Sequence, residues 1–408
     1  MAEEARAVIE RIGHRGDGIA TIGDEQVYIP NTLPGETVLF GRRGDRGDLR
    51  RNLTPSPERI APVCRYFDTC GGCVLQHWQT QSYRAWKRDL VAAALSHEGI
   101  EAPLGDLIDA HGEGRRRIVL HARQTREGVG VGFMALRSHT LVEIEDCPVL
   151  VPTLARAFGI AKRIAAELAK KKPLDVQFTV TVGGLDVDVR GSGPLDTANR
   201  SALAKIATEE RLARLTRHGE VVAQLAEPAI EPGHARIVLP PGAFLQATEA
   251  GENALAAIVL QAVRGAAKIA DLFCGVGTFA LRLAENARVL ALDQEETAVA
   301  ALARAAKAPG LKPVEAVHRD LFRRPLIATE LKGFDAVVLD PPRQGAEAQA
   351  RNLTQSSVPR IIYVSCNPAS FARDAKILCE GGYRLAAVTP VDQFRYSAHV
   401  ELVGVFER

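Results

Sequence analysis

The last third of the chain alternates short apolar runs with segments typical of helices, and this alternation restricts the fold more than any other feature. The apolar runs span 267–270, 289–292, 336–339 and 361–364. Strands that alternate with helices form a parallel sheet built from βαβ units. Two closing runs, 385–390 and 400–406, have no helix between them, which predicts a final antiparallel strand. We therefore expect an α/β fold whose C-terminal domain, residues 241–408, is Rossmann-like.

Two further domains are expected upstream, because 408 residues exceed one ordinary core. Residues 1–55 contain short apolar runs separated by Gly-rich turns, which favours a small OB-like β-barrel. Residues 42–51 carry five arginines and two aspartates, and this run fits either a solvated loop or a phosphate-binding surface. A proline-containing linker at 54–57 then leads into a mixed α/β central domain, residues 56–240.

Composition excludes few classes of protein. Lys and Arg total 51 and Asp and Glu total 49, and a net charge of +2 neither requires nor excludes nucleic acid, since a binding surface needs only a local excess. No run of 18 apolar residues is present, and the first residues lack the basic start and apolar stretch of a secretory signal. We expect a cytoplasmic, monomeric protein with no membrane partner.

A glycine-rich segment, 271–280, follows the first strand of the expected C-terminal sheet. Gly275 and Gly277 allow the backbone to approach a ligand closely, and the helix start beyond them offers free N–H groups. Asp293 ends the next strand, where its carboxylate can accept hydrogen bonds from ribose hydroxyls. The pattern Gly-x-Gly-x-x-Ala also fits a dinucleotide-binding fingerprint, so this segment alone leaves a dehydrogenase open.

A second loop, Asp340-Pro341-Pro342-Arg343, follows the fourth strand and therefore faces the same crevice. The two prolines fix the backbone and direct Asp340 inward. A dehydrogenase has no need of such a loop, whereas many methyltransferases carry a related loop with an aromatic fourth residue. Arg343 occupies that position here, which removes the stacking platform that N-methylation uses.

Cys366 lies at the end of the fifth strand, immediately before a helix that Pro368 is suited to begin. A thiol near a helix start is stabilised as the reactive thiolate, although cysteine is also commonly a buried, inert residue. A thiolate that adds to C6 of uracil produces an enolate, whose C5 can attack the methyl group of a sulfonium donor. A base must then remove the C5 proton. Glu401 is the expected base, and His399, two residues earlier and hence on the same face of a strand, is the rival.

Four cysteines form a second group of candidate functional residues, Cys64, Cys70, Cys73 and Cys147. Gly71 and Gly72 allow the chain to wrap tightly around an inorganic centre. Four thiolates suit either tetrahedral zinc or a [4Fe–4S] cluster, and the spacing alone leaves both open. We interpret Cys274 and Cys379 as packing residues.

Together these segments resemble the RNA uracil-C5 methyltransferase family over nearly the whole chain. The matching motifs, in order, are Phe244-Leu245-Gln246, 271–277, 340–343, Ser365-Cys366-Asn367-Pro368 and His399-Val400-Glu401. The resemblance implies a class I methyltransferase domain, an N-terminal TRAM domain, Cys366 as nucleophile and Glu401 as base. It implies that S-adenosylmethionine is held by Gln246, Phe273, Thr278, Asp293, Asp320 and Asp340. Thr278 stands where some members have Asn, and Asp293 where many have Glu, while residues 392–397 lack the usual Pro and Thr.

The resemblance also implies a [4Fe–4S] cluster on the four cysteines, which the ribosomal-RNA branch of the family carries and the transfer-RNA branch lacks. The expected activity is methylation of uridine C5 in 23S ribosomal RNA through a covalent Cys366–C6 adduct, with the target base flipped out of its stack. Transfer-RNA uridine methylation is the competing enzyme hypothesis, and a non-catalytic iron–sulfur RNA-binding protein is the hypothesis from another class. Cytosine-C5 methylation is less favoured, because the Asp340 loop contains no cysteine.

Overall fold

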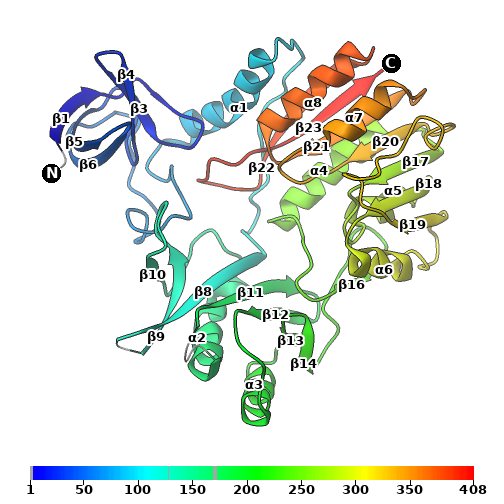
Figure 1. Ribbon diagram of the computed structural model, residues 1–408, viewed down its shortest axis with the longest axis horizontal. Coiled ribbons are helices and arrows are strands. Elements are labelled where there is room, and N and C mark those ends of the chain that lie inside the picture. Colours follow the sequence, from blue (N-terminus) through cyan, green and yellow to red (C-terminus); the bar gives the residue numbers. More distant parts are fainter. Residues whose placement is uncertain (1–2, 127, 169–171) are drawn as a thin grey trace.

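The computed structural model describes residues 3–126, 128–168 and 172–408 (Figure 1). A six-stranded sheet forms the N-terminal part of the molecule. Its order is β1-β5-β6-β4-β3-β2, and alternate residues of its strands, including Val27, Ile29, Val38 and Phe40, fill a small core. The strands are β1 (Glu3–Val8), β2 (Arg11–Ile12), β3 (Gly18–Ile22), β4 (Glu25–Ile29), β5 (Thr37–Arg43) and β6 (Arg46–Thr54). The arginine-rich run 42–51 lies on the β5–β6 hairpin rather than in a loop, with Arg50 and Arg51 exposed.

A seven-stranded sheet of order β10-β9-β8-β11-β12-β13-β14 forms the middle of the molecule. Its strands are β8 (Arg117–Thr125), β9 (Gly128–Met134), β10 (Leu141–Glu143), β11 (Leu174–Thr181), β12 (Gly184–Arg190), β13 (Arg214–Arg217) and β14 (Glu220–Gln224). Helices α2 (Ala157–Leu168) and α3 (Thr197–Glu209) pack apolar residues against this sheet, and a short helix η1 (Pro152–Arg156) precedes α2. A two-stranded sheet, β15 (Ala229–Ile230) with β16 (Ile237–Val238), leads toward the C-terminal part.

The C-terminal sheet has the order β19-β18-β17-β20-β21-β23-β22-β7. The strands are β17 (Lys268–Leu272), β18 (Arg288–Asp293), β19 (Val314–His318), β20 (Ala336–Leu339), β21 (Arg360–Ser365), β22 (Arg384–Asp392), β23 (Glu401–Glu407) and β7 (Ile108–Asp109). Strands β17 to β21 pair in parallel, and β23 is antiparallel to both of its neighbours. The predicted α/β class with a Rossmann-like C-terminal domain and a closing antiparallel strand is confirmed.

Helices cover both faces of this sheet, so its central strands are almost entirely apolar. Apolar residues of α4 (Glu249–Ala262), α5 (Thr278–Leu283) and α6 (Glu296–Ala305) belong to the core on one face. Residues of α7 (Glu347–Thr354) and α8 (Pro368–Glu380) belong to the core on the other face. In the part of the chain that the structure describes, no helix has the length and apolar character needed to cross a membrane.

Helix α1 (Thr80–His97) joins the C-terminal core although its residues fall within the segment expected to be the central domain. Val91 and Leu95 pack into the same core as α8, and β7 pairs with β22 at the edge of the sheet. Figure 1 shows α1 running from the N-terminal sheet toward α8. Residues 80–109 thus extend the C-terminal sheet, and α1 reaches the loop that enters β23.

Candidate active site

The turn from β17 into α5 requires unusual backbone conformations. Phe273, Gly275 and Gly277 all have positive φ, of 64°, 54° and 92°. A Cβ at Gly277 would lie 2.3 Å from Leu302, so only glycine fits there. The Gly275 amide donates to Asp293 Oδ2 at 2.8 Å, which ties this turn to the end of β18.

The candidate cofactor residues Phe273, Thr278, Asp293 and Asp320 lie beyond the carboxyl ends of three adjacent strands. Thr278 is the first residue of α5, and Asp293 is the last residue of β18. Asp320 follows β19, accepts the Phe322 amide at 2.9 Å and is partly buried. The Phe273 and Phe322 rings lie 5.3 Å apart, so the loops after β17 and β19 touch. This edge is where an open α/β sheet binds its ligand.

Gln246 and Asp340 close the other side of this crevice. Gln246 lies just before α4 and is 6% exposed, and its Nε2 donates to Asp340 Oδ2 at 3.2 Å. Burial raises the pKa of Asp340 well above its usual range, and the nearby carboxyls of Glu401, Asp271 and Asp293 act in the same direction. Asp271 itself is fully buried, which, with the charge of Asp293, raises its pKa to about 8. The crevice is therefore rich in carboxyl groups with raised pKa values.

Cys366 follows β21 directly and is partly exposed. Burial, then the charges of Glu401 and Asp340, raise the pKa of its thiol to about 12, while Arg343 acts in the opposite direction. The expectation that the start of α8 stabilises a thiolate is wrong for the protein without ligands. Desolvation and two acidic neighbours outweigh the partial positive charge of a helix start.

Glu401, the first residue of β23, is 3% exposed and accepts a hydrogen bond from Gln393 Nε2 at 3.1 Å. Burial raises the pKa of its carboxyl to about 7, against the lowering effects of Gln393, Lys87 and Arg343. His399 lies outside the strand, so the predicted alternation of His399 and Glu401 on one strand face is wrong. Desolvation and the charge of Arg343 lower the pKa of His399 to about 4, and its Nδ1 lies 3.2 Å from Arg343 Nη2. Glu401 is thus better suited than His399 to accept a proton near neutral pH.

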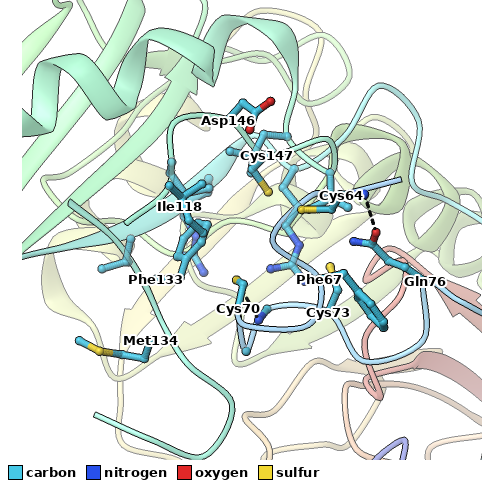
Figure 2. A pocket seen from close by; sticks show the side chains of 18 residues that line it. Cys64, Phe67, Cys70, Cys73, Gln76, Ile118, Phe133, Met134, Asp146 and Cys147 are labelled. Carbon is cyan, nitrogen blue, oxygen red and sulfur yellow. Dashed lines mark hydrogen bonds between the residues drawn. The ribbon is translucent and has the colours of Figure 1, made fainter. Parts of the chain in front are cut away.

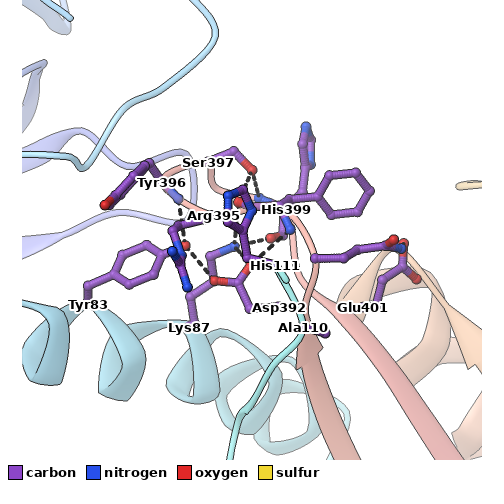
Figure 3. Close-up of polar contacts among 12 residues, drawn as sticks. Tyr83, Lys87, Ala110, His111, Asp392, Arg395, Tyr396, Ser397, His399 and Glu401 are labelled. Atoms are coloured by element: carbon purple, nitrogen blue, oxygen red, sulfur yellow. Dashed lines mark hydrogen bonds and ion pairs between the residues drawn. The ribbon is translucent and has the colours of Figure 1, made fainter. Parts of the chain in front are cut away.

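The base loop, residues 393–400, joins β22 to Glu401 and is held by α1 (Figure 3). Lys87 is fully buried, and its Nζ donates to Asp392 Oδ1 at 2.9 Å, to the Phe394 carbonyl at 3.3 Å and to the His399 carbonyl. The Tyr83 hydroxyl donates to Asp392 Oδ2 at 2.7 Å. One lysine thereby contacts the residue before the loop and carbonyls near both of its ends.

Lys87, Tyr83 and Gln393 were missed by sequence reasoning. A lysine in the middle of a helix is normally solvated. The available signal was its spacing, because Tyr83, Lys87, Val91 and Leu95 follow one another at four-residue intervals on one helix face. A lysine in an otherwise apolar stripe indicates a buried partner of opposite charge.

The four candidate metal-binding cysteines line one cavity of about 360 Å³ (Figure 2). Backbone amides donate to two of the sulfur atoms, Tyr66 N to Cys64 Sγ and Gly72 N to Cys70 Sγ, each at 3.4 Å. Burial raises the pKa of Cys73 to about 11 and that of Cys147 to about 12. Among residues 3–126, 128–168 and 172–408, no three or more His, Cys, Asp or Glu side chains are arranged to hold a metal ion. The thiols share a cavity without converging as ligands of a single ion.

The cysteine loop, residues 64–76, contacts the base loop directly. A Cβ at Gly71 would lie 2.9 Å from the Met134 carbonyl, so the cysteine loop packs too tightly against β9 for a side chain there. Beyond Cys73, the Val74 and Leu75 amides donate to the Tyr396 carbonyl at 2.8 and 3.2 Å. The cysteine loop and α1 therefore hold the base loop from two directions.

Comparison with known proteins agrees with this geometry. A sequence profile of the tRNA (Uracil-5-)-methyltransferase family matches residues 240–408. The chain is 45% identical to an uncharacterized RNA methyltransferase of Brucella suis, covering 100% of this chain and 99% of the relative. It is 34% identical to the 23S rRNA (uracil(1939)-C(5))-methyltransferase RlmD of Chromohalobacter salexigens, covering 98% and 88%. The structure matches that of Pyrococcus abyssi tRNA (uracil-54, C5)-methyltransferase in complex with S-adenosyl-L-homocysteine, with a TM-score of 0.75, 24% identity and coverage of 98% and 99%, which shows a common fold.

Proposed function

Because the chain belongs to the RNA uracil-C5 methyltransferase family, we propose that it methylates C5 of a uridine in 23S ribosomal RNA, using S-adenosylmethionine. One observation carries the chemistry. Ser365 and Leu402 are the last pair between β21 and β23, and Cys366 and Glu401 are the residues next to that pair. The charge of Glu401 acts on the Cys366 thiol, which supports a shared site for the thiol and the carboxyl.

The roles of the chain's own groups follow from this arrangement. The Cys366 thiol gives up its proton to water, Sγ bonds to C6 of the uracil, and the electrons of the C5–C6 double bond move onto the O4 enolate. Arg343, whose charge acts on both Cys366 and Glu401, is the cation available to stabilise that enolate. When C5 carries the new methyl group, Glu401 removes the C5 proton, the double bond re-forms and Sγ leaves with its bonding electrons. A carboxyl with a pKa of about 7 is half ionised near neutral pH, as this step requires.

S-adenosylmethionine, when bound, supplies an electrophilic methyl group. The side chains proposed to hold it are Gln246, Phe273, Thr278, Asp293, Asp320 and Asp340. The glycine turn fits such a ligand, since Gly275 has open space where a Cβ would stand and the start of α5 lies beside it. The buried carboxyls of Asp340 and Asp271 also suit a positively charged ligand.

We propose in addition that Cys64, Cys70, Cys73 and Cys147 hold a [4Fe–4S] cluster. Four thiols that line one cavity of about 360 Å³ can supply the four thiolates that such a cluster needs. Amide donors to the sulfur atoms are a usual feature around such clusters. Acid-labile sulfide with matching iron in anaerobically purified protein supports the cluster, and stoichiometric zinc without sulfide refutes it.

The substrate class rests on the 34% identity to the 23S rRNA enzyme and on these four cysteines. We propose a three-part division in which 1–55 is a TRAM-like RNA-binding domain, 56–240 carries the cluster except for residues 80–109, which join the C-terminal sheet, and 241–408 carries the methyl-transfer site. The exposed Arg50 and Arg51 of β6 are suited to phosphate contacts.

The proposed function is tested with purified protein and RNA from a strain that lacks the gene. Wild-type chain should form 5-methyluridine in ribosomal RNA, Cys366→Ala should form none, and Cys379→Ala, a cysteine on α8 that plays no part in the crevice, should behave as wild type. Glu401→Gln should accumulate a protein–RNA adduct that survives denaturing electrophoresis. Methylation of transfer RNA alone would refute the ribosomal substrate, and full activity of Cys366→Ala would refute the covalent chemistry.

A further inference from the structure

Two buried glutamines connect the cofactor side of the crevice to Glu401. Gln246 Nε2 donates to Asp340 Oδ2 at 3.2 Å. Gln393 Nε2 donates both to Gln246 Oε1 at 2.6 Å and to Glu401 Oε1 at 3.1 Å. A continuous path of hydrogen bonds therefore runs from Asp340 to Glu401 through two amide groups.

The orientation of the Gln393 amide is fixed by its surroundings. Its Nε2 faces two acceptor oxygens, and its Oε1 accepts the Thr248 amide at 3.4 Å, so a rotated amide would place an oxygen against both acceptors. Gln393 is fully buried. A Cβ at Gly251 would lie 2.7 Å from Gln393 Cβ, which shows how closely α4 packs on this side chain. Gln393 thus has neither room nor partners for another arrangement.

We propose that Gln393 is a positioning residue, which orients the Glu401 carboxylate toward the crevice and joins it to the residues proposed to hold the cofactor. The assignment deepens the proposed function and rests on it for the role of Glu401. Gln393 contacts the base rather than the reacting atoms, and it acts by donating to the ionised carboxylate. Removal of this donor leaves a buried carboxylate less stable and less well oriented.

Several charged groups near Glu401 also influence the pKa of its carboxyl. Lys87 of α1 and Arg343 of the loop after β20 favour its ionised form. Asp340 in the same loop and Cys366 after β21 interact with it as acidic neighbours. None of these groups changes when Gln393 is replaced by an uncharged residue, so a shift in the titration of Glu401 reports the lost hydrogen bond.

The test compares Gln393→Met with Gln349→Met. Methionine keeps the length of the side chain and removes the amide. Gln349 on α7 is the matched control, because it is 1% exposed and both atoms of its amide are hydrogen-bonded, Oε1 to the Leu326 amide at 2.8 Å and Nε2 to the Leu326 carbonyl at 3.0 Å. Loss of a buried glutamine amide is common to both variants, whereas contact with Glu401 is lost only in the first.

Two measurements are made on each variant. The first is an infrared titration of the Glu401 carboxyl band, which is identified by its absence in Glu401→Gln and needs no RNA. The second is the rate at which the protein–RNA adduct resolves in a single turnover, measured across pH. A hydrogen bond to a charged group is strong enough to move the Glu401 midpoint up by about one pH unit in Gln393→Met. Adduct resolution at pH 7 should then slow by about fivefold, with adduct formation little changed.

An unchanged infrared midpoint in Gln393→Met, or an equal shift in Gln349→Met, would overturn the assignment. If Gln393→Met does not fold, Gln393→Glu takes its place, since it has the same shape and places an acidic group against Glu401, which should raise the midpoint further. The adduct measurement and the infrared titration distinguish failure of the proposed function from failure of the role proposed for Gln393. A wild-type chain that forms no RNA adduct refutes the proposed function, while the infrared titration still decides whether Gln393 controls Glu401.

Discussion

Replacement of Glu401 by glutamine should stabilise the protein, and the gain should grow with pH. Glu401 is 3% exposed, and its pKa is raised from an ordinary value of 4.5 to about 7. Between these two values the folded chain keeps a proton that the unfolded chain releases. The folded state therefore loses stability as pH rises from 4.5, and this loss is complete above pH 7. Glutamine has the same shape and no charge, so the stability of Glu401→Gln should not fall with pH in this way.

The size of the effect follows from the rise of the Glu401 pKa from 4.5 to about 7. At about 1.36 kcal/mol for each pH unit between these values, the variant should be more stable than wild type by about 3 kcal/mol at pH 8.5 and by about 1 kcal/mol at pH 5.5. The measurement is urea-induced unfolding of both proteins across this pH range, followed by circular dichroism. The difference between the two ends of the range, about 2 kcal/mol, is the quantity to compare.

Glu209→Gln is the control for this experiment. Glu209 lies on the surface, and its ion pair with Arg163 lowers the pKa of its carboxyl, so its removal should cost stability as pH rises. The two glutamate variants should therefore respond to pH in opposite directions. A stability difference between Glu401→Gln and wild type that does not vary with pH would refute the claim that Glu401 is a buried carboxyl with a raised pKa.

Three other predictions concern the groups around the base loop. Lys87→Met should lower the free energy of unfolding, measured in urea, by about 3–5 kcal/mol, because it leaves a buried aspartate without its ion pair. A decrease below about 1 kcal/mol would contradict a stabilising role for this ion pair. His399→Gln should resolve the RNA adduct nearly as fast as wild type, since a pKa of about 4 makes His399 a weak base; a rate as low as that of Glu401→Gln would reverse the assignment. Cys73→Ser should speed hydrogen exchange at the Val74 and Leu75 amides, measured by mass spectrometry, and unchanged exchange would separate the cysteine loop from the base loop.

The sheet could be predicted from the sequence because its signals are local. Each apolar run of the C-terminal part is bounded by turn residues, and the closing pair lacks a helix, so the α/β class and the closing antiparallel strand follow from general rules. The position of α1 could not be predicted in this way. Its apolar stripe shows that one face is buried, but both neighbouring sheets offer an apolar surface, and only the pairing of β7 with β22 brings α1 onto the C-terminal sheet.

The candidate site was predictable where a residue sits directly at a strand end. Asp293, Asp340 and Cys366 follow their strands by at most one residue, and strand ends in an open sheet meet at one edge. Gln393 and Lys87 act through partners that are distant in sequence, as in the contact between Lys87 and Asp392. The stripe on α1 indicates that Lys87 has a buried partner, but no spacing pattern in a single chain identifies Asp392 as that partner.

Cys366 shows why the position of a residue does not determine its chemistry. The charge of a helix start is worth about 0.3–1 kcal/mol, which is less than one pKa unit. The pKa of the thiol instead rises from 9.0 to about 12, in the other direction. Burial and the carboxyls of Glu401 and Asp340 produce it, and neither carboxyl is near Cys366 in sequence. Each of these groups can be identified in the sequence. Their combined effect on the pKa of the thiol depends on the packing of β20, β21 and β23 side by side.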